Sequence, residues 1–383
     1  MEIKQDLRVL DLFSGCGGLS LGLHWAKNSA GLGFKTAAAT DIWESASLTF
    51  EHNQGLSPYV APISKELVRK ILKEVGPVDV VVGGPPCQGF STSGKRSLDD
   101  PRNQLVVAYL DAIEIAKPKV FLMENVSGFT TFQDGKLLEE VKLRAESMGY
   151  QVRTAIVQAS IVGVPQRRRR FIMIGTPPGV DIVFPGEFDG ATPPKISALD
   201  VDLTYRDGQE SWTLWDAISD LAQINAGQKS SEYKSGPQNA LQSFLRGTNE
   251  SISLHAAVNH KPSFIEMMSY IPQGKSALDP EISERIPEAI RPKSGYPNSY
   301  SRLKPDQPAP TITRNFTTPS SANCIHPYQD RALSFREGAR CQTFPDSYEF
   351  FGTPEEVRLQ IGNAVPPLLA KALGEAILHA IER

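Results

Sequence analysis

Short apolar segments alternate with amphipathic ones through the first 175 residues of this 383-residue chain, and this alternation restricts the fold more than any other feature. The apolar segments have the length and the β-branched or aromatic content of buried strands. The segments between them, such as 105–115 and 136–148, carry apolar residues at the three- and four-residue spacing of helices. Strands and helices in this order predict a doubly wound α/β fold with a mostly parallel sheet. The expected strands are Val9–Phe13, Thr36–Thr40, Val78–Val82, Val120–Met123 and Phe171–Ile174.

The composition is that of an ordinary folded protein, with 40% hydrophobic and 22% charged residues. A length of 383 residues exceeds the usual size of one domain. After Gly175, proline and glycine become frequent and the periodicity weakens. We therefore expect a first domain formed by residues 1–184 and 325–383, and a second, loop-rich domain formed by residues 185–324. Prolines 366 and 367 have the position of a helix start, and the helix after them is expected to pack on the first domain.

Charge and cysteine content exclude several classes of protein. A formal net charge of -3 is unlike that of proteins that bind polyanions through bulk charge, so any contact with nucleic acid must be local. The four cysteines, Cys16, Cys87, Cys324 and Cys341, have neither C-x-x-C pairing nor the spacing of a zinc site. We find no signal-peptide pattern and no apolar run of membrane-spanning length. These features predict a cytoplasmic protein that binds no metal and no membrane.

One cysteine follows directly after an expected strand. The valine-rich strand 78–82 is followed by Gly-Gly-Pro-Pro, which must end it because proline cannot donate to a sheet ladder, and Cys87 comes next. Ligands of open α/β sheets bind at this edge, where a thiolate is a candidate nucleophile. A small buried cysteine used for packing is the more common case for an arbitrary cysteine. The Pro-Pro-Cys-Gln context favours the nucleophile.

A glycine-rich loop follows the first expected strand. Its sequence, Asp-Leu-Phe-Ser-Gly-Cys-Gly-Gly-Leu over residues 11–19, lets the backbone approach a ligand closely. It departs from the dinucleotide fingerprint, because Ser20 stands where G-x-G-x-x-G requires its third glycine. Asp41 ends the next strand, where a carboxylate can accept hydrogen bonds from the ribose of an adenosine ligand. A tight turn and a solvated capping aspartate are an equally good interpretation of these residues taken alone.

Polar residues also end the later strands. Glu124 follows the apolar segment 120–123, where partial desolvation would let it hold or share a proton near neutral pH; a salt-bridged glutamate at a helix start is the alternative. Four consecutive arginines, residues 167–170, lead into the strand 171–174. In an extended chain Arg168 and Arg170 share one face, so this pair could point into a site and bind a carbonyl or phosphate oxygen. A solvated basic surface is the simpler interpretation of the other two arginines.

Taken together and in order, these segments resemble the DNA (cytosine-5)-methyltransferase family of prokaryotic restriction-modification systems. Six blocks between residues 11 and 373 carry the resemblance: DLFSGCGGLS, GGPPCQGFS, ENV, QRRRRFIMIG, RLKPDQPAPTIT and IGNAVPPLLAKAL. The resemblance implies a Rossmann-like S-adenosylmethionine-dependent methyltransferase domain with a smaller, loop-rich target-recognition domain. It also implies that a methyl group is transferred from S-adenosylmethionine to C5 of a cytosine flipped out of a specific double-stranded DNA sequence.

The resemblance implies four catalytic residues, Cys87, Glu124, Arg168 and Arg170. The thiolate of Cys87 would add to C6 of the cytosine and make C5 nucleophilic, while Glu124 would hydrogen-bond or protonate N3. Arg170, with Arg168 in support, would hold O2 of the base. The loop formed by residues 91–97 would close as a mobile lid over the extruded base.

The cofactor contacts of the family fall on positions along the whole chain. Phe13 and the glycine loop would border S-adenosylmethionine, Asp41 would bind its ribose, and Ile42 would pack on its adenine. Many members of the family have an Asp-Ile pair that contacts the adenine, whereas this chain has Pro62 and Ile63. The resemblance therefore implies the apolar contact from Ile63 but not the contact from the aspartate. The implied cofactor-binding residues are Phe13, Ser14, Gly15, Cys16, Gly17, Gly18, Asp41, Ile42, Ile63, Pro86, Leu105, Asn363 and Val365.

Double-stranded DNA is the implied partner, and a cognate restriction endonuclease acting on the same site is a candidate second one. The enzyme would act as a monomer and protect host DNA from that nuclease. A tRNA cytosine-5 methyltransferase, a catalytically inactive DNA-binding homologue and a Rossmann oxidoreductase are the alternatives. Intact Cys87 and Glu124 count against the inactive homologue, and Ser20 counts against the oxidoreductase.

Overall fold

The computed structural model describes residues 5–86, 103–186, 211–296 and 299–382, except for the side chain of Gln133, together with the backbone of residues 197–198 and 201–202. The chain forms two compact units. The first comprises Met1–Val162, Arg169–Pro194 and Val365–Arg383, and the second comprises Gly163–Arg168 and Lys195–Ala364.

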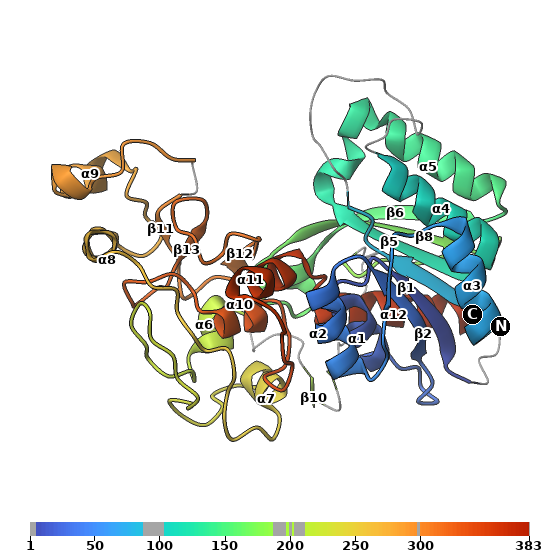
Figure 1. Cartoon of the computed structure of the whole chain (residues 1–383), viewed down its shortest axis with the longest axis horizontal. Helices are drawn as coiled ribbons and strands as arrows, with labels where there is room; N and C mark the ends of the chain where they lie inside the picture. Colours follow the sequence, from blue (N-terminus) through green and yellow to red (C-terminus); the bar gives the residue numbers. More distant parts are fainter. Residues whose placement is uncertain are drawn as a thin grey trace. The chain divides into compact units, whose positions relative to one another are not determined.

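A seven-stranded sheet forms the centre of the first unit (Figure 1). In spatial order its strands are β3 (Tyr59–Val60), β2 (Phe34–Asp41), β1 (Leu7–Leu12), β4 (Val80–Gly83), β5 (Val120–Val126), β8 (Arg169–Thr176) and β6 (Gln151–Gln158). All neighbouring pairs are parallel except those of β8, which is antiparallel to both β5 and β6. The predicted α/β class with a mostly parallel sheet is therefore confirmed. The strand order reverses between β1 and β4, which is where open α/β sheets bind ligands.

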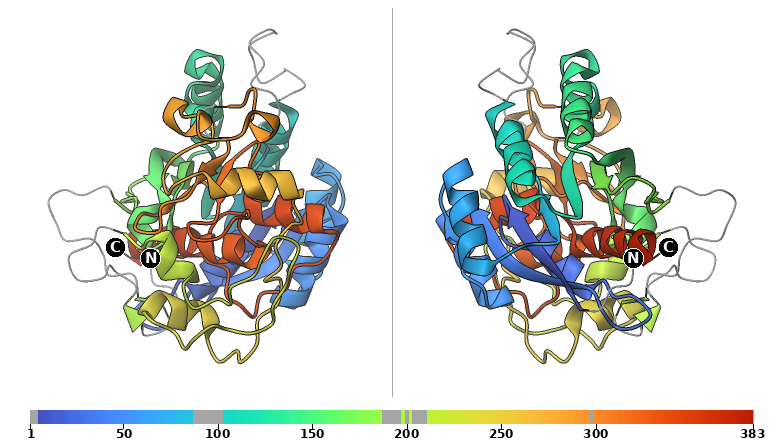
Figure 2. Two further views of the ribbon diagram at one scale, coloured as in Figure 1. Left: turned by 90° about the vertical axis from the view of Figure 1, so that its left-hand side faces the viewer. Right: turned by 90° about the vertical axis from the view of Figure 1, so that its right-hand side faces the viewer.

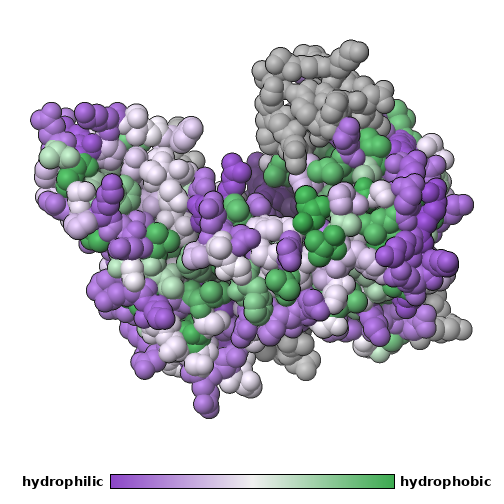
Figure 3. All heavy atoms as spheres, viewed as in Figure 1, coloured by the Kyte–Doolittle hydropathy of each residue, from purple (hydrophilic) through white to green (hydrophobic). Residues whose placement is uncertain are grey.

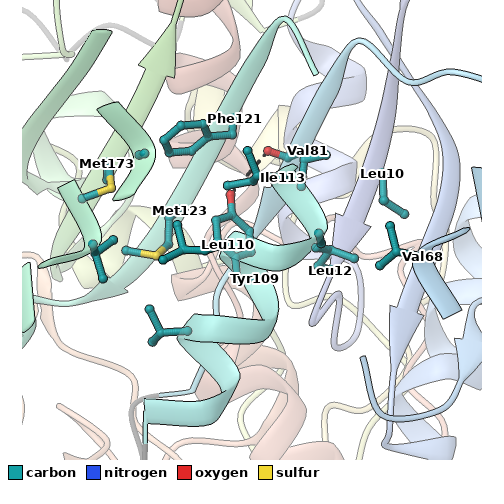
Figure 4. Packing of buried hydrophobic residues seen from close by; sticks show 14 of the residues in the cluster. Leu10, Leu12, Val68, Val81, Tyr109, Leu110, Ile113, Phe121, Met123 and Met173 are labelled. Atoms are coloured by element: carbon teal, nitrogen blue, oxygen red, sulfur yellow. Dashed lines mark hydrogen bonds between the residues drawn. The ribbon is translucent and has the colours of Figure 1, made fainter. Parts of the chain in front are cut away.

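Helices α3 (Lys65–Val75), α4 (Gln104–Ala116) and α5 (Lys136–Ser147) share one apolar core with β1, β4 and β5. Helix α4 buries Val106, Tyr109, Leu110 and Ile113, whose spacing of three and four residues places them on one helix face. The Tyr109 hydroxyl donates to the Leu122 carbonyl oxygen at 2.7 Å. It also lies near the carbonyl oxygen of Val81, a contact that Figure 4 shows. The outer side of α3 is charged and gives a hydrophilic surface at the right of Figure 3.

The remaining helices of the first unit are α1 (Gly18–Trp25), α2 (Glu44–Gln54) and α12 (Pro367–Glu382). The helix expected after the two prolines does pack on this unit, because α12 lies against α1; both can be followed in Figure 2. Gly22 makes the close approach possible, since a Cβ there would lie 2.0 Å from the Pro367 carbonyl oxygen. Among the described residues, one stretch, Pro354–Glu382, is long and apolar enough to cross a membrane, and 78% of its apolar window is buried, as in a core helix.

The second unit consists of short elements joined by long loops. Its helices are α6 (Leu214–Ile218), α7 (Ala240–Arg246), α8 (Pro262–Ser269), α9 (Pro280–Ser283), α10 (Phe335–Cys341) and α11 (Pro354–Asn363). Its strands are β7 (Gln166–Arg167), β9 (Ser197–Ala198), β10 (Val201–Asp202), β11 (Ser301–Arg302), β12 (Ala309–Pro310) and β13 (Asn323–Ile325). The sparse secondary structure agrees with the weak periodicity of this part of the sequence.

The boundary between the units differs from the expected one by three segments. Residues 163–168 and 325–364 belong to the second unit, and residues 185–194 belong to the first. Helix α10 explains the largest difference. Its Arg340 is fully buried and bonds to two carboxylates of the second unit, those of Asp220 and Asp346. A buried guanidinium needs such partners, so α10 is bound to the unit that supplies them.

Candidate active site

The carboxyl ends of three neighbouring strands bring the predicted residues of the first unit together. The register pairs Leu12 of β1 with Gly83 of β4, and Gly83 with Met123 of β5. The loop after β1, the Gly84–Pro86 turn after β4 and Glu124 of β5 therefore lie at one edge of the sheet. This juxtaposition is what the sequence predicted for a binding site in a parallel sheet.

The loop after β1 has an unusual backbone. Phe13, Gly15 and Gly17 have φ angles of 58°, 53° and 88°, a region that glycine adopts readily and other residues rarely. A Cβ at Gly15 would meet no atom within 4 Å, so this residue faces open space. Ser14 fixes the loop to β2, because its backbone N–H and its hydroxyl both donate to the Thr40 carbonyl oxygen.

Asp41 holds this loop from the end of β2. One carboxylate oxygen accepts the backbone N–H of Gly15 at 2.7 Å, and the other accepts the N–H of Trp43 at 2.9 Å. Burial raises the pKa of Asp41 above its ordinary value, and the hydrogen bonds from the two backbone N–H groups oppose that rise. Because a carboxylate has about four acceptor positions, Asp41 can still accept further hydrogen bonds.

Two other predicted residues of this loop contribute in different ways. Burial raises the pKa of the Cys16 thiol to about 12, so this cysteine is a packed thiol at neutral pH rather than a nucleophile. Gly18 is the first residue of α1.

Apolar side chains lie near the same edge. Ile42, directly after Asp41, is 71% exposed, which is a high value for a large apolar residue at a strand end. Leu105 is half-buried and Pro86 is exposed. Ile63 is half-buried and lines a surface cavity of about 430 Å³. The other lining residues are Ser64, Lys65, Gln104, Val107, Ala108, Asp111 and Arg144.

The predicted nucleophile, Cys87, lies outside the described residues, as does the predicted lid at residues 91–97. The turn that leads to Cys87 is described as far as Pro86. The side-chain amide of Asn125 in β5 donates to the Pro85 carbonyl oxygen at 2.9 Å and so fixes this turn to the strand that carries Glu124.

Glu124 and Arg170 form an ion pair with 2.7 Å between Glu124 Oε1 and Arg170 Nε. Their side chains are only 11% and 12% exposed. The antiparallel register explains the pairing, because Glu124 lies opposite Ile172 and Arg170 is two residues away on the same strand face. Gly84 leaves room for the carboxylate, since a Cβ there would lie 3.1 Å from Glu124 Oε2.

Arg168 has a different environment from the one expected. It belongs to the second unit, is 1% exposed, and donates to the backbone carbonyl oxygens of Ile312, Gly362 and Ala364. Arg168 and Arg170 do not belong to one continuous strand, which was the condition for their sharing a face. Residues 166–167 pair with β12 in the second unit, whereas β8 pairs with β5 and β6 in the first, so the chain changes sheets at Arg168.

The last two predicted cofactor residues fall on either side of a unit boundary. Asn363 ends α11 in the second unit and is exposed. Val365 belongs to the first unit, is half-buried and precedes α12. Among the residues that the structure describes, no group of three or more His, Cys, Asp or Glu side chains could hold a metal ion.

Gly84 and Asn125 belong to motifs of the sequence, but the sequence predicts no role in the site for either residue. The signal for Gly84 was its place before two prolines, and the signal for Asn125 was its place directly after Glu124. Their roles depend on distances across the sheet, which no pattern along the chain contains.

Comparison with known proteins agrees with this arrangement. Residues 7–379 match the family described as C-5 cytosine-specific DNA methylase. Type II methyltransferase M1.HphI of Haemophilus parahaemolyticus is 34% identical over 381 residues, which cover 97% of this chain and 87% of that protein. DNA (cytosine-5)-methyltransferase 1 of Gallus gallus is 30% identical over 461 residues, which cover 97% of this chain and 30% of that protein.

Solved structures give the same result. A putative DNA modification methyltransferase encoded within a prophage of E. coli matches with a TM-score of 0.75 and 26% identity, over 99% of this chain and 100% of that one. The S. pombe Dnmt2 methyltransferase, at 20% identity, shares the fold with a TM-score of 0.58, over 98% of this chain and 100% of that one. The chain therefore belongs to the C-5 cytosine-specific DNA methylase family and is a DNA cytosine-5 methyltransferase of the restriction-modification type.

Proposed function

We propose that this enzyme transfers a methyl group from S-adenosylmethionine to C5 of a flipped-out cytosine through a covalent bond between Cys87 and C6. The observation that carries the proposal is the buried Glu124 and Arg170 pair beside the turn that leads to Cys87. A carboxyl group held in place by a guanidinium at a strand end is suited to recognise the N3 and O2 edge of a cytosine.

The residues after β1 and β2 fit S-adenosylmethionine. Gly15 faces open space, Asp41 has acceptor capacity left for ribose hydroxyls, and Ile42 offers an uncovered apolar side chain for a base. The cavity beside Ile63 is a candidate for the adenine end. The family resemblance is the support for further proposed contacts with Phe13, Ser14, Cys16, Gly17, Gly18, Pro86, Leu105, Asn363 and Val365. S-adenosylmethionine, when bound, supplies an electrophilic methyl group.

The chain's own residues carry the other steps. The Cys87 thiolate forms a bond to C6, and the electron pair of the C5–C6 double bond moves toward C5. Glu124 donates a hydrogen bond or a proton at N3, and Arg170 holds both the carboxyl group and O2, so the charge developing on the ring is neutralised. After methylation the C5 proton leaves to a base, the C5–C6 double bond re-forms and the thiolate is expelled. Arg168 would be a positioning residue, because its guanidinium is anchored on three backbone carbonyl oxygens and it precedes Arg170 by two residues in the chain.

The second unit is the proposed target-recognition domain, whose side chains would read base edges of the duplex. Its loop-rich structure provides many polar side chains outside regular elements. The cellular role that follows is protection of host DNA, in the cytoplasm and as a monomer, from an endonuclease that cuts the same site.

A duplex that carries 5-fluorocytosine at the target tests the covalent step, because fluorine cannot leave as a proton does and the adduct persists. The wild-type enzyme with S-adenosylmethionine should give a denaturation-resistant protein–DNA band, and Cys87→Ser should give none. Cys324→Ala is the matched control, since Cys324 is a buried thiol of β13 and its loss should leave the band unchanged. Absence of a band from the wild type, or an undiminished band from Cys87→Ser, would contradict the mechanism.

A further inference from the structure

A chain of side-chain hydrogen bonds crosses from β2 through α1 to β1 below the glycine loop. The Thr36 hydroxyl donates to Ser20 Oγ at 3.1 Å, and the Ser20 hydroxyl donates to Asp11 Oδ2 at 2.6 Å. Asp11 is fully buried and Ser20 is 1% exposed. None of the three residues has a role in the site described above.

Ser20 occupies the position at which a dinucleotide fingerprint has its third glycine. That glycine lets helix and strand pack closely. Here the side chain does more than fill space, because its hydroxyl connects the first turn of α1 to the end of β1. The helix needs such a connection, since its N-cap residue, Gly17, provides no side-chain cap.

The loop that this connection encloses is the one that holds Gly15 against Asp41. Asp11 precedes the loop, Ser20 follows it, and the bond between them fixes the distance between the two ends. A shorter or longer separation would move the Gly15 N–H away from the Asp41 carboxylate, which it contacts at 2.7 Å.

Asp11 is also an unusual group to find buried at this place. Its second oxygen, Oδ1, has no hydrogen-bond partner among the described residues. Of the ionisable groups in the described part of the chain, Asp41 of β2 and Tyr109 of α4 interact with it, and neither carries a positive charge. Burying a carboxyl group without a positively charged partner costs folding free energy, so packing alone does not explain this residue.

We propose that Asp11, acting through Ser20, is a positioning residue that holds the loop from Phe13 to Gly17 in the shape that binds the cofactor. This inference rests on the proposed S-adenosylmethionine site. It predicts that loss of the connection weakens cofactor binding specifically, while the methyl-transfer step at saturating cofactor and the affinity for DNA stay close to those of the wild type.

Isothermal titration with S-adenosylmethionine, steady-state kinetics and a DNA gel shift test the proposal on Ser20→Ala. We expect Kd and KM for S-adenosylmethionine to rise about tenfold, as for the loss of one buried hydrogen bond, with kcat and the DNA Kd changed less than about threefold. Thr36→Val, which removes only the outer donor, should give a smaller rise in the same direction. Ser47→Ala is the matched control, because the buried Ser47 hydroxyl of α2 has no partner among the described residues; its Kd should equal that of the wild type.

Each outcome decides a separate question. Wild-type cofactor affinity in both Ser20→Ala and Thr36→Val overturns the inference, and so does a parallel loss of kcat, DNA affinity and cofactor affinity, which indicates general unfolding. If the wild type itself does not bind S-adenosylmethionine, the proposed cofactor is wrong, whatever the variants do.

Discussion

Replacement of Asp11 by asparagine should change how the stability of the first unit depends on pH. Burial is the main cause that raises the pKa of Asp11 from 3.8 to about 7, and the nearby Asp41 adds to the rise, while the hydrogen bond from Ser20 opposes it. The folded protein therefore holds the Asp11 proton more tightly than the unfolded chain does. The stability that this proton contributes is fully present below about pH 4 and is lost as the pH rises through about 7.

The magnitude follows from the size of the shift. Each pH unit between the two pKa values is worth about 1.4 kcal/mol, so the free energy of unfolding of the wild type should fall by roughly 3 kcal/mol between pH 5 and pH 8 through this group alone. Asp11→Asn has no titrating group at this position. Its buried amide costs stability, but by the same amount at every pH. The wild type should therefore lose its advantage over the variant as the pH rises.

Hydrogen exchange of peptides from β1 and α1, measured by mass spectrometry from pH 5 to pH 8, gives the opening free energy of this region for both proteins. The opening free energy of the wild type minus that of Asp11→Asn should fall by roughly 3 kcal/mol between pH 5 and pH 8. Asp181→Asn is a control, because Asp181 is 64% exposed and its replacement should leave the pH profile parallel to that of the wild type. Parallel profiles for Asp11→Asn would show that Asp11 is ionised in the folded protein and would refute the reasoning.

Three further substitutions test the packing around the site. Gly84→Ala places a methyl group 3.1 Å from the Glu124 carboxylate and should displace it, which should lower kcat by about 10- to 100-fold. The Kd for S-adenosylmethionine should stay unchanged. Normal turnover would show that Glu124 can move without cost. Asn125→Ala removes the only side-chain donor that the described residues offer to the Pro85 carbonyl oxygen, and should lower the yield of the 5-fluorocytosine adduct while DNA binding is retained; an unchanged yield would mean that this bond does not position the turn. Gly22→Ala forces α1 and α12 apart and should lower the unfolding free energy by about 1–3 kcal/mol in urea denaturation, whereas wild-type stability would show that the two helices separate freely.

The sequence predicted most of the first unit correctly because its signals are local. Each of the five expected strands lies within, or overlaps, a strand of the structure, and the two quoted amphipathic segments are α4 and α5. Strand β6 was not predicted, since Gln151–Gln158 is partly polar and only one of its residues is fully buried. The placement of α10 was also beyond the sequence, because a buried arginine cannot be distinguished from a surface one until its carboxylate partners are known.

The sequence by itself determined which chemical groups follow which strands. A cysteine follows a valine-rich strand and a glutamate follows the next apolar strand, while a glycine loop and an aspartate follow the first two strands. Tertiary structure alone decided which partner each group has. Glu124 pairs with Arg170, while Arg168, two residues earlier, bonds to three backbone carbonyl oxygens, because the chain changes sheets between β7 and β8. Ser20, which the sequence shows only as a departure from a glycine pattern, has the Asp11 carboxyl group as its partner because helix and strand meet there. Partners of this kind depend on distances between segments far apart in the chain, and such distances arise only when the sheet and its helices have formed.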